Sequence, residues 1–571
     1  MRVAGVELAE VLGDALRTCR QHFFAAAAFS FLINLLLLAP AIYMLQVYDR
    51  VVATGGKATL FFVTVALALA LLTMTLLDAI RSRLLVRASN RLDSILSPII
   101  LNRMLSGGGS QSMQAMRDFD TVRQTLASPV AAAVLDAPWT PIFILFAFLL
   151  HFWIGMLALV AIVLLITIAW RNQQMTRQAI EVSSRELAGA HTAAQHVASH
   201  GGTVAALGMV KAMTSRHVAM RSDGLSRLMQ SQFLGSRYSA LSRFLRMFVQ
   251  SAALGVGALL AIAGSISSGA IVAGSILVGR ALQPVEALVS GWPTLSTARA
   301  SLVRLTEAFA ADMSNDGERT RLPDFAGHLE VDQVGVRDEN GRPILLGVSL
   351  IAGRGDVIGI VGPSGSGKTT LAKVIAGAIE PDHGTVRFDG ARRADWDGDL
   401  LGRSVGYLPQ EPRLFEGSVK DNVSRFSAWE KPVDQLIDQK VIEAAKKAHV
   451  HELILGLPQG YDTPLGPNGA GLSAGQSQRI AFARALFGSP SLLILDEPNA
   501  FLDAEGEAAL VHSIEAERQR GATILIVAHR KGVLAAASRL LVLEAGRVKL
   551  LGPSAEVVAR LAQANDSETA A

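Results

Sequence analysis

Gly362-Pro363-Ser364-Gly365-Ser366-Gly367-Lys368-Thr369-Thr370 is the stretch that decides the fold of the second half of the chain. It matches the pattern G-x-x-x-x-G-K-[ST], and the run 356–361 before it predicts a buried strand, whereas 371–376 predicts a helix. Glycines allow a tight turn in which consecutive backbone N–H groups face one anionic group. Lys368 would then reach the β- and γ-phosphates, and the Thr369 hydroxyl would ligate Mg²⁺. The stretch therefore predicts a nucleoside-triphosphate site.

Composition separates an apolar first half from a second half of ordinary polarity. Half of the 571 residues are hydrophobic and 18% are charged, with a mean hydropathy of +0.35, which is too apolar for a wholly soluble chain. The net charge of +4, from 53 basic and 49 acidic residues, argues against nucleic acid as a partner. Cys19 is the single cysteine, so no intrachain disulfide can form.

Six apolar runs in the first half are long enough to cross a bilayer. We expect them at about 23–47, 59–77, 141–150 with its flanks, 154–170, 248–263 and 270–290. Two long basic sections, 81–129 and 171–246, lie on one side of these spans, and the charge-poor connections lie on the other. The positive-inside rule therefore places both termini in the cytosol.

The expected fold is a membrane α-helical bundle of six transmembrane helices fused to an α/β P-loop nucleotide-binding domain. The expected boundaries are an N-terminal cytosolic segment at 1–21, a membrane domain at 22–292, a connector at 293–327, the nucleotide-binding domain at 328–565 and a disordered tail at 566–571.

Two further stretches extend the predicted nucleotide site. Leu492-Leu493-Ile494-Leu495-Asp496-Glu497 reads as a buried strand that ends in two carboxylates. Asp496 would hold Mg²⁺, directly or through water, and Glu497 would polarise the attacking water as general base. Before it, Leu472-Ser473-Ala474-Gly475-Gln476 precedes a helix expected from Gln478. That stretch is either a second phosphate-binding helix N-terminus or an ordinary N-cap.

In this order the stretches resemble the ATP-binding-cassette family, whose signature is similar to 472–476. The resemblance implies that Gln410 senses Mg²⁺ and the nucleophile, that Asp503 lies in a loop between subunits, and that His529 contacts the γ-phosphate. It also implies a homodimer, because the family sandwiches ATP between the phosphate loop of one subunit and the signature of the other. The implied ATP-binding residues are Gly362, Pro363, Ser364, Gly365, Ser366, Gly367, Lys368, Thr369, Thr370, Ser473, Ala474, Gly475, Gln476 and Asp503; the implied catalytic residues are Glu497, His529 and Gln410; the implied Mg²⁺ ligands are Thr369, Gln410 and Asp496.

The chain departs from the family pattern at two places. Ala474 replaces the first glycine of the usual signature pair, where a methyl group should be tolerated. The aromatic residue that usually stacks on adenine is missing near 336–338, so we assign no adenine contact.

The whole chain looks like a type I ABC exporter, and most closely like the PrtD-like ATPases of type I secretion. The similar stretches are 44–51, 135–143, 275–286 and Asp496-Glu497-Pro498-Asn499. PrtD-like ATPases export proteases, lipases or S-layer proteins with C-terminal signals. The resemblance implies an ATP-driven translocase in the bacterial inner membrane that moves unfolded polypeptide to a periplasmic membrane-fusion adaptor and a TolC-type outer-membrane channel. A lipid or drug half-exporter is the alternative with the same architecture, and a membrane-tethered regulatory ATPase is one of another class.

The family mechanism also implies loops that pass the motion of the cassettes to the spans, which we expect around 104–116 and 193–207. Membrane lipids would surround the six spans. Arg280 and Glu286 lie within or near the sixth span. They either form a polar pathway for the polypeptide or are solvated or paired beyond the membrane, and the sequence leaves both readings open.

Overall fold

The computed structural model describes residues 2–3, 6–7, 10–106, 111–310, 322–338, 340–430, 436–466, 469–528 and 531–569. The chain forms two compact units, 1–313 and 314–571.

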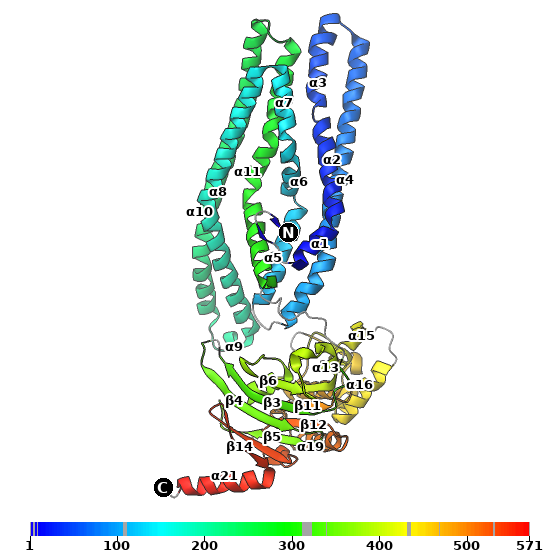
Figure 1. The fold of residues 1–571 in the computed structure, drawn as a ribbon, viewed down its shortest axis with the longest axis vertical. Coiled ribbons are helices and arrows are strands. Elements are labelled where there is room, and N and C mark those ends of the chain that lie inside the picture. Colours follow the sequence, from blue (N-terminus) through cyan, green and yellow to red (C-terminus); the bar gives the residue numbers. More distant parts are fainter. Residues whose placement is uncertain are drawn as a thin grey trace. The chain divides into compact units, whose positions relative to one another are not determined.

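Long helices make up most of the described part of the first unit (Figure 1). A short hairpin of β1 (Arg2–Val3) and β2 (Val6–Glu7) precedes them. The helices are α1 (Glu10–Thr18), α2 (Arg20–Leu36), α3 (Ala39–Gln46), the π-helix η1 (Val47–Val52), α4 (Lys57–Ser106), α5 (Gln111–Leu126), α6 (Pro129–Asp136), the 3-10 helix η2 (Ala137–Trp139), α7 (Thr140–Leu150), α8 (Phe152–Ser199), α9 (Gly201–Ala206), α10 (Val210–Ile262) and α11 (Ser268–Ala310).

Within the described residues, six helical segments are long and apolar enough to cross a membrane, which confirms the predicted number of spans. None of the most apolar window of the second span is buried, and Phe61 and Leu72 on it are more than half exposed. Apolar surface on this scale needs lipid or protein to cover it. The side chains between the helices, such as Phe143, Ile154 and Leu282, are fully buried and form the core of the bundle.

The two predicted polar sections are helical extensions of the spans. α10 has 53 residues, a length of about 80 Å at ~1.5 Å per residue, whereas the hydrocarbon layer is ~30 Å thick. α11 runs without a break through Pro293 to Ala310, so the start of the expected connector at 293–327 is a helical continuation of the sixth span. A proline removes one intrahelical hydrogen bond, and the buried Leu305 and Phe309 keep the helix packed beyond it.

Polar side chains connect the first three spans, and an ion pair connects α10 to Glu286 of the sixth span. Arg81 donates hydrogen bonds to Asp136 (2.6 Å) and to Ser30 (2.8 Å), so that α2, α4 and α6 share one charged cluster. Glu286 forms an ion pair with Arg246 of α10. Of the two readings for Glu286, the structure therefore favours the paired one.

The second unit contains a six-stranded sheet in the order β14-β13-β5-β12-β11-β8 and a four-stranded antiparallel sheet in the order β4-β3-β6-β7. In the larger sheet every neighbouring pair is parallel except β13 and β14. The strands are β3 (Leu329–Arg337), β4 (Pro343–Ala352), β5 (Val357–Val361), β6 (His383–Phe388), β7 (Ala391–Arg392), β8 (Val405–Leu408), β9 (Gly417–Ser418), β10 (Pro464–Leu465), β11 (Leu492–Asp496), β12 (Thr523–Val527), β13 (Arg539–Glu544) and β14 (Arg547–Pro553).

Helices cover the larger sheet, as expected for an α/β domain. Residues of α18 and α19 pack on one face, and α12 and the smaller sheet share a core with the other. The helices are α12 (Lys368–Ala376), η3 (Arg393–Asp395), α13 (Gly398–Ser404), α14 (Val419–Val423), α15 (Ser427–Glu430), α16 (Leu436–Lys447), α17 (His451–Leu455), η4 (Gly460–Asp462), α18 (Ala474–Leu486), α19 (Ala504–Gln519), α20 (Lys531–Leu534) and α21 (Ser554–Thr569). Because α21 extends to Thr569, residues 566–569 are helical and not the disordered tail that we expected.

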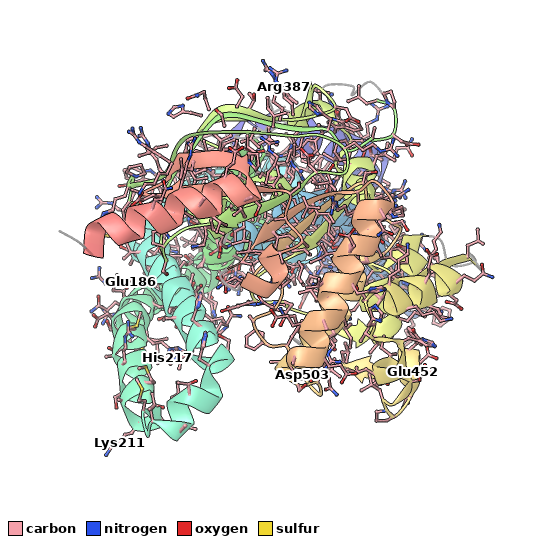
Figure 2. The ribbon with its side chains drawn as sticks, turned by 90° about the horizontal axis from the view of Figure 1, so that it is seen from below. Glu186, Lys211, His217, Arg387, Glu452 and Asp503 are labelled. Carbon is pink, nitrogen blue, oxygen red and sulfur yellow. The ribbon has the colours of Figure 1, made fainter. Side chains whose placement is uncertain are left out.

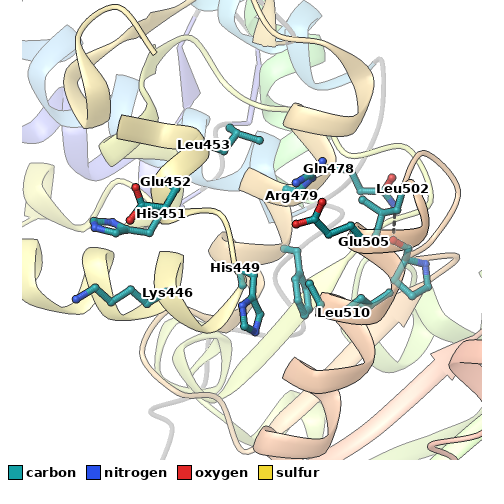
Figure 3. A pocket seen from close by; sticks show the side chains of 15 residues that line it. Lys446, His449, His451, Glu452, Leu453, Gln478, Arg479, Leu502, Glu505 and Leu510 are labelled. Atoms are coloured by element: carbon teal, nitrogen blue, oxygen red, sulfur yellow. Dashed lines mark hydrogen bonds between the residues drawn. The ribbon is translucent and has the colours of Figure 1, made fainter. Parts of the chain in front are cut away.

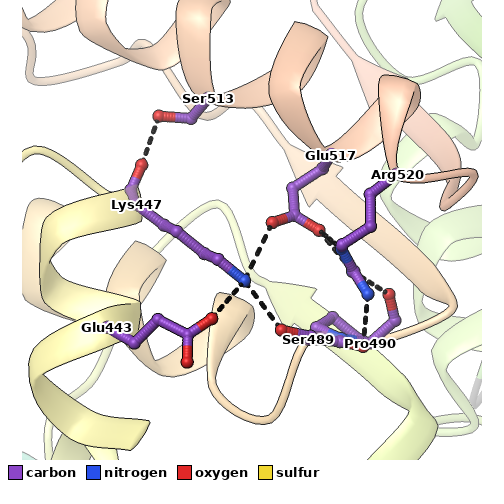
Figure 4. A network of polar contacts seen from close by, with 7 residues as sticks. All are labelled: Glu443, Lys447, Ser489, Pro490, Ser513, Glu517 and Arg520. Carbon is purple, nitrogen blue, oxygen red and sulfur yellow. Dashed lines mark hydrogen bonds and ion pairs between the residues drawn. The ribbon is translucent and has the colours of Figure 1, made fainter. Parts of the chain in front are cut away.

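A network of charged groups ties α16 to α19 and to the turn after α18 (Figure 4). The buried carboxylate of Glu517 lies 3.7 Å from the Lys447 ammonium and accepts hydrogen bonds from the Arg520 guanidinium. Lys447 also donates to Ser489 (2.7 Å), and Arg520 donates to the Pro490 carbonyl (2.8 Å). The network fixes the helices that stand beside the signature helix.

Candidate nucleotide-binding site

Four adjacent parallel strands end at one edge of the larger sheet. These are β5, β12, β11 and β8, and each predicted catalytic motif follows the carboxyl end of one of them. Ligands bind at this edge in open α/β sheets, because the loops after the strands converge there. The fold therefore brings the sequence-predicted motifs together.

The phosphate loop connects β5 to α12, as its pattern predicts. A Cβ atom at Gly362 would lie 2.1 Å from the Leu543 carbonyl oxygen, and Gly367 caps α12 with a φ of 97°, so both positions require glycine. The Lys368 ammonium donates to the carbonyls of Gly362 (3.0 Å) and Pro363 (2.8 Å). Burial lowers the pKa of this ammonium, and the nearby carboxylates of the site oppose the shift.

Asp496 and Thr369 offer oxygen ligands to a cation. The Thr369 hydroxyl donates to Asp496 Oδ1 (3.2 Å), whereas Asp496 Oδ2 is buried and has no hydrogen-bond partner among the described residues. Burial raises the pKa of the Asp496 carboxyl; the hydrogen bond from Thr369 opposes the shift, and the neighbouring charge of Glu497 adds to it. A carboxylate and a hydroxyl oxygen are the donors that Mg²⁺ prefers, so these residues fit that ion.

Glu497 and Gln410 face each other across the ends of β11 and β8. The Gln410 amide donates to Glu497 Oε2 (3.0 Å), and the Glu497 backbone has a φ of 49°. Its N–H donates to the Val527 carbonyl (2.9 Å), which holds this uncommon conformation. The hydrogen-bonded backbone therefore fixes the direction of the Glu497 carboxylate. His529, the fourth predicted motif, lies outside the described residues.

The signature stretch forms the first turn of α18, which begins at Ala474, four residues before the expected start. Ser473 is its N-cap: the Ser473 hydroxyl accepts from the Gln476 N–H (3.2 Å), and the Gln476 side chain accepts from the Ser473 N–H (2.9 Å). Ser473 and Ala474 are exposed. Among the described residues, no hydrogen bond joins the signature to the phosphate loop.

Gln478 is a functional residue to which the sequence pattern assigned no role. Its side chain is 1% exposed. Its amide donates to the carbonyls of Pro498 (2.7 Å) and Glu497 (3.3 Å), and its Oε1 accepts from the Phe501 N–H (3.1 Å). The signature helix therefore holds the loop that carries Glu497. A lone polar residue on the buried face of a helix was the signal that could have revealed it.

Asp503 lies at the amino end of α19 (Figure 2), where its side chain accepts from the Gly506 N–H (2.8 Å). The carboxylate is 65% exposed and lies 3.8 Å from the Arg479 guanidinium of α18. Asp503 therefore caps a helix and also presents a negative charge at the surface, next to the signature.

A pocket of about 510 Å³ adjoins this loop (Figure 3). Its lining includes Arg479, Glu505, Lys446 and Glu452, so charges of both signs face the same space. A nucleotide needs an excess of positive charge or of backbone N–H groups, and the phosphate loop is not part of this lining. We assign the nucleotide to the sheet edge rather than to this pocket.

Comparison with known proteins identifies the family of the chain. The family model described as ABC transporter matches residues 345–500. The type I secretion system ATP-binding protein PrsD of Rhizobium meliloti (strain 1021) is 37% identical over 556 residues, which is 96% of this chain and 94% of PrsD. The alpha-hemolysin translocation ATP-binding protein HlyB of Escherichia coli is 28% identical over 551 residues, or 94% of this chain and 76% of HlyB.

A solved structure shares the fold of nearly the whole chain. It is a bacterial Atm1-family ABC exporter with ATP bound, which matches with a TM-score of 0.79 and 22% sequence identity. The match covers 95% of this chain and 96% of the exporter. At this identity the likeness concerns the fold, which is that of a type I ABC exporter.

Proposed function

Because the chain belongs to the ABC transporters, among the type I secretion ATP-binding proteins, we propose that it is a half-transporter that exports unfolded polypeptide across the bacterial inner membrane. The observation that carries the proposal is the gathering of the phosphate loop, Gln410 and the Asp496–Glu497 pair at one sheet edge in a chain with six candidate spans. A nucleotide hydrolysed there supplies the free energy for transport.

The residues at the edge divide the chemistry among them. The N–H groups of the phosphate loop and Lys368 hold the triphosphate. Thr369, Gln410 and Asp496 would hold Mg²⁺, which neutralises charge on the phosphates when it is bound. Glu497 accepts a proton from the attacking water. The Gln410 amide, 3.0 Å from the Glu497 carboxylate, orients that carboxylate and the water. His529 is proposed from its position in the motif alone.

Two copies of the chain complete each site in the proposed assembly. Within the described residues, the signature residues Ser473–Gln476 make no hydrogen bond to the phosphate loop of the same subunit. Ser473 and Ala474 are exposed, so they are free to contact another subunit. An exposed helix N-terminus attracts phosphate. We therefore place the signature of one subunit on the ATP held by the other, with Asp503 in the contact between them.

The domain plan and the membrane orientation are also proposals. Both termini and the nucleotide-binding domain would lie in the cytosol, since the long basic sections are on their side of the spans. The loops around 104–116 and 193–207 would pass the closure of the cassettes to the helices. Export would continue through a periplasmic membrane-fusion adaptor and a TolC-type channel, with a C-terminal signal on the secreted substrate.

The test is ATP hydrolysis by the purified chain in lipid nanodiscs, measured with added secretion-signal peptide and with a panel of lipids and drugs. We expect the signal peptide to change the ATPase rate and the panel to leave it unchanged. Stimulation by a lipid or a drug, with no response to signal peptides, would identify a flippase instead. A specific activity that does not fall when the protein is diluted to monomers would exclude the shared sites.

A further inference from the structure

A cavity of about 670 Å³ lies within the first unit, between α5, α8, α10 and α11. Its lining is mostly hydroxyl and amide side chains, and no ionisable residue is among the residues that line it. The section 171–246, which supplies much of this wall, carries ten Lys and Arg residues. The basic side chains therefore point elsewhere, and the wall of this cavity is uncharged.

The hydroxyl groups of the wall present oxygen acceptors to the cavity. Seven of the ten hydroxyl groups donate their proton to a backbone carbonyl three or four residues earlier, so their lone pairs can accept from a ligand. These bonds run from Thr121 to Arg117 (2.9 Å), Thr125 to Thr121 (2.8 Å), Ser128 to Thr125 (2.7 Å), Ser231 to Leu228 (2.7 Å), Ser236 to Phe233 (2.9 Å), Ser290 to Glu286 (2.8 Å) and Thr297 to Pro293 (2.9 Å).

Asn172 adds an acceptor that lacks a partner. It lines the cavity and is 1% exposed, and its Oδ1 accepts no hydrogen bond from the described residues. A buried carbonyl oxygen without a donor is uncommon in native proteins and calls for a ligand or a water.

Pro293 also leaves a backbone carbonyl in the cavity wall without its usual donor. It lines the cavity together with Val289, four residues earlier on α11. Proline has no N–H, so the Val289 carbonyl loses the donor that an α-helix usually supplies. The wall therefore offers many acceptors, and its side-chain donors include the amides of Gln124, Asn172 and Gln232.

We propose that this hydroxyl-lined cavity binds the main chain of an extended polypeptide through its N–H groups. The inference rests on the proposed export function and names what the transporter recognises. A main-chain N–H is a neutral donor that recurs in every sequence, so a wall of neutral acceptors can hold many different substrates. A phosphate headgroup or a cationic drug would bring a charge that the lining does not compensate.

The position of the cavity suits the entry of a chain from the cytosol. Asn172 lies two residues after Trp170, the expected end of the fourth span, which is about 3 Å along the helix. Tryptophan favours the membrane–water interface. The cavity thus begins where the spans leave the membrane.

The test uses the full chain in nanodiscs and two fluorescent peptides of the same uncharged sequence, one of them N-methylated at alternate residues. We expect the parent peptide to bind at least tenfold more tightly than the methylated one, as measured by fluorescence anisotropy. Asn172→Leu should weaken binding of the parent about tenfold. Gln174→Leu, an exposed amide on the same helix, should bind it like the wild type, and thermal melting checks that both variants fold.

Equal binding of the two peptides would overturn the proposal, and so would displacement of the parent peptide by glycerol phosphate. The experiments distinguish a failure of this cavity proposal from a failure of the proposed export function. If signal peptides change the ATPase rate while neither neutral peptide binds, export stands and the cavity is not the recognition site. If signal peptides leave the ATPase rate unchanged, the export function itself fails.

Discussion

Replacing Gln478 by leucine would separate the signature helix from the loop that carries Glu497. Leucine is of similar size and keeps the buried face of α18 filled, but it removes three hydrogen bonds, to the carbonyls of Pro498 and Glu497 and from the Phe501 N–H. The change therefore tests whether the side chain organises the catalytic loop or only fills space.

The cost follows from the groups that lose their partner. Each buried polar group left unpaired costs about 1–3 kcal/mol, and two of the three bonds to Gln478, those with Pro498 and Phe501, are 3.1 Å or shorter. Phe501 is 50% exposed, so water can reach its N–H and reduce the loss. We expect a destabilisation of about 2–3 kcal/mol, which lowers the melting temperature by roughly 5–10 °C for a domain of this size.

The catalytic effect is expected to exceed the effect on ATP binding. Gln478 lies outside the phosphate loop, so KM for ATP should change little, whereas misplacement of Glu497 should lower kcat by about 10–100-fold. Differential scanning fluorimetry and a coupled ATPase assay on the full chain measure both quantities. Gln519→Leu is the control, because its amide is exposed and contacts only Glu515 in the described residues, at 3.4 Å. A lower melting temperature with an unchanged kcat would show that Gln478 does not position Glu497.

Two further substitutions probe buried carboxylates of the second unit. Glu517→Gln leaves the Arg520 guanidinium without its countercharge, while Lys447 keeps Glu443 at 2.9 Å, and should cost about 3 kcal/mol in thermal or urea unfolding. Glu515→Gln on the same helix, which is far more exposed, should cost under ~1 kcal/mol; equal effects would contradict the role given to the network. Burial raises the pKa of the Asp496 carboxyl, so folding favours its protonated form. The protonated carboxyl therefore contributes to stability at low pH, and this contribution is lost as the pH rises through the folded-state pKa. At pH 7, Asp496→Asn should therefore raise the melting temperature of the nucleotide-free protein, with a smaller gain at lower pH, and should abolish the extra stability given by Mg²⁺ and ATP; a destabilised nucleotide-free variant would refute this reasoning.

The sequence was sufficient where a local pattern determines the structure. The phosphate loop, the strand that ends at Asp496 and the six spans follow from glycine spacing and apolar runs, and the structure has all of them. The relation between Gln410 and Glu497 was implied by family resemblance, and their 3.0 Å contact could not be read from residues 87 positions apart.

The errors arose where packing outweighs a local signal. The sixth span was expected to end near 290 and a separate connector to follow from 293, but the two share one helix, α11, whose far end packs through Leu305 and Phe309. Gln478 and Asn172 are buried side chains among other polar residues of their helices, and their roles depend on what the other elements place against them. Periodicity cannot supply that information.

The central claim is that hydrolysis at Glu497 drives the export of polypeptide. The most direct measurement is secretion of a signal-bearing polypeptide by cells that carry Glu497→Gln, together with ATP binding and turnover of the purified variant. We expect that ATP still binds, that turnover falls by about 10²–10⁴-fold and that secretion stops. Secretion at the wild-type level by a variant that no longer hydrolyses ATP would contradict it.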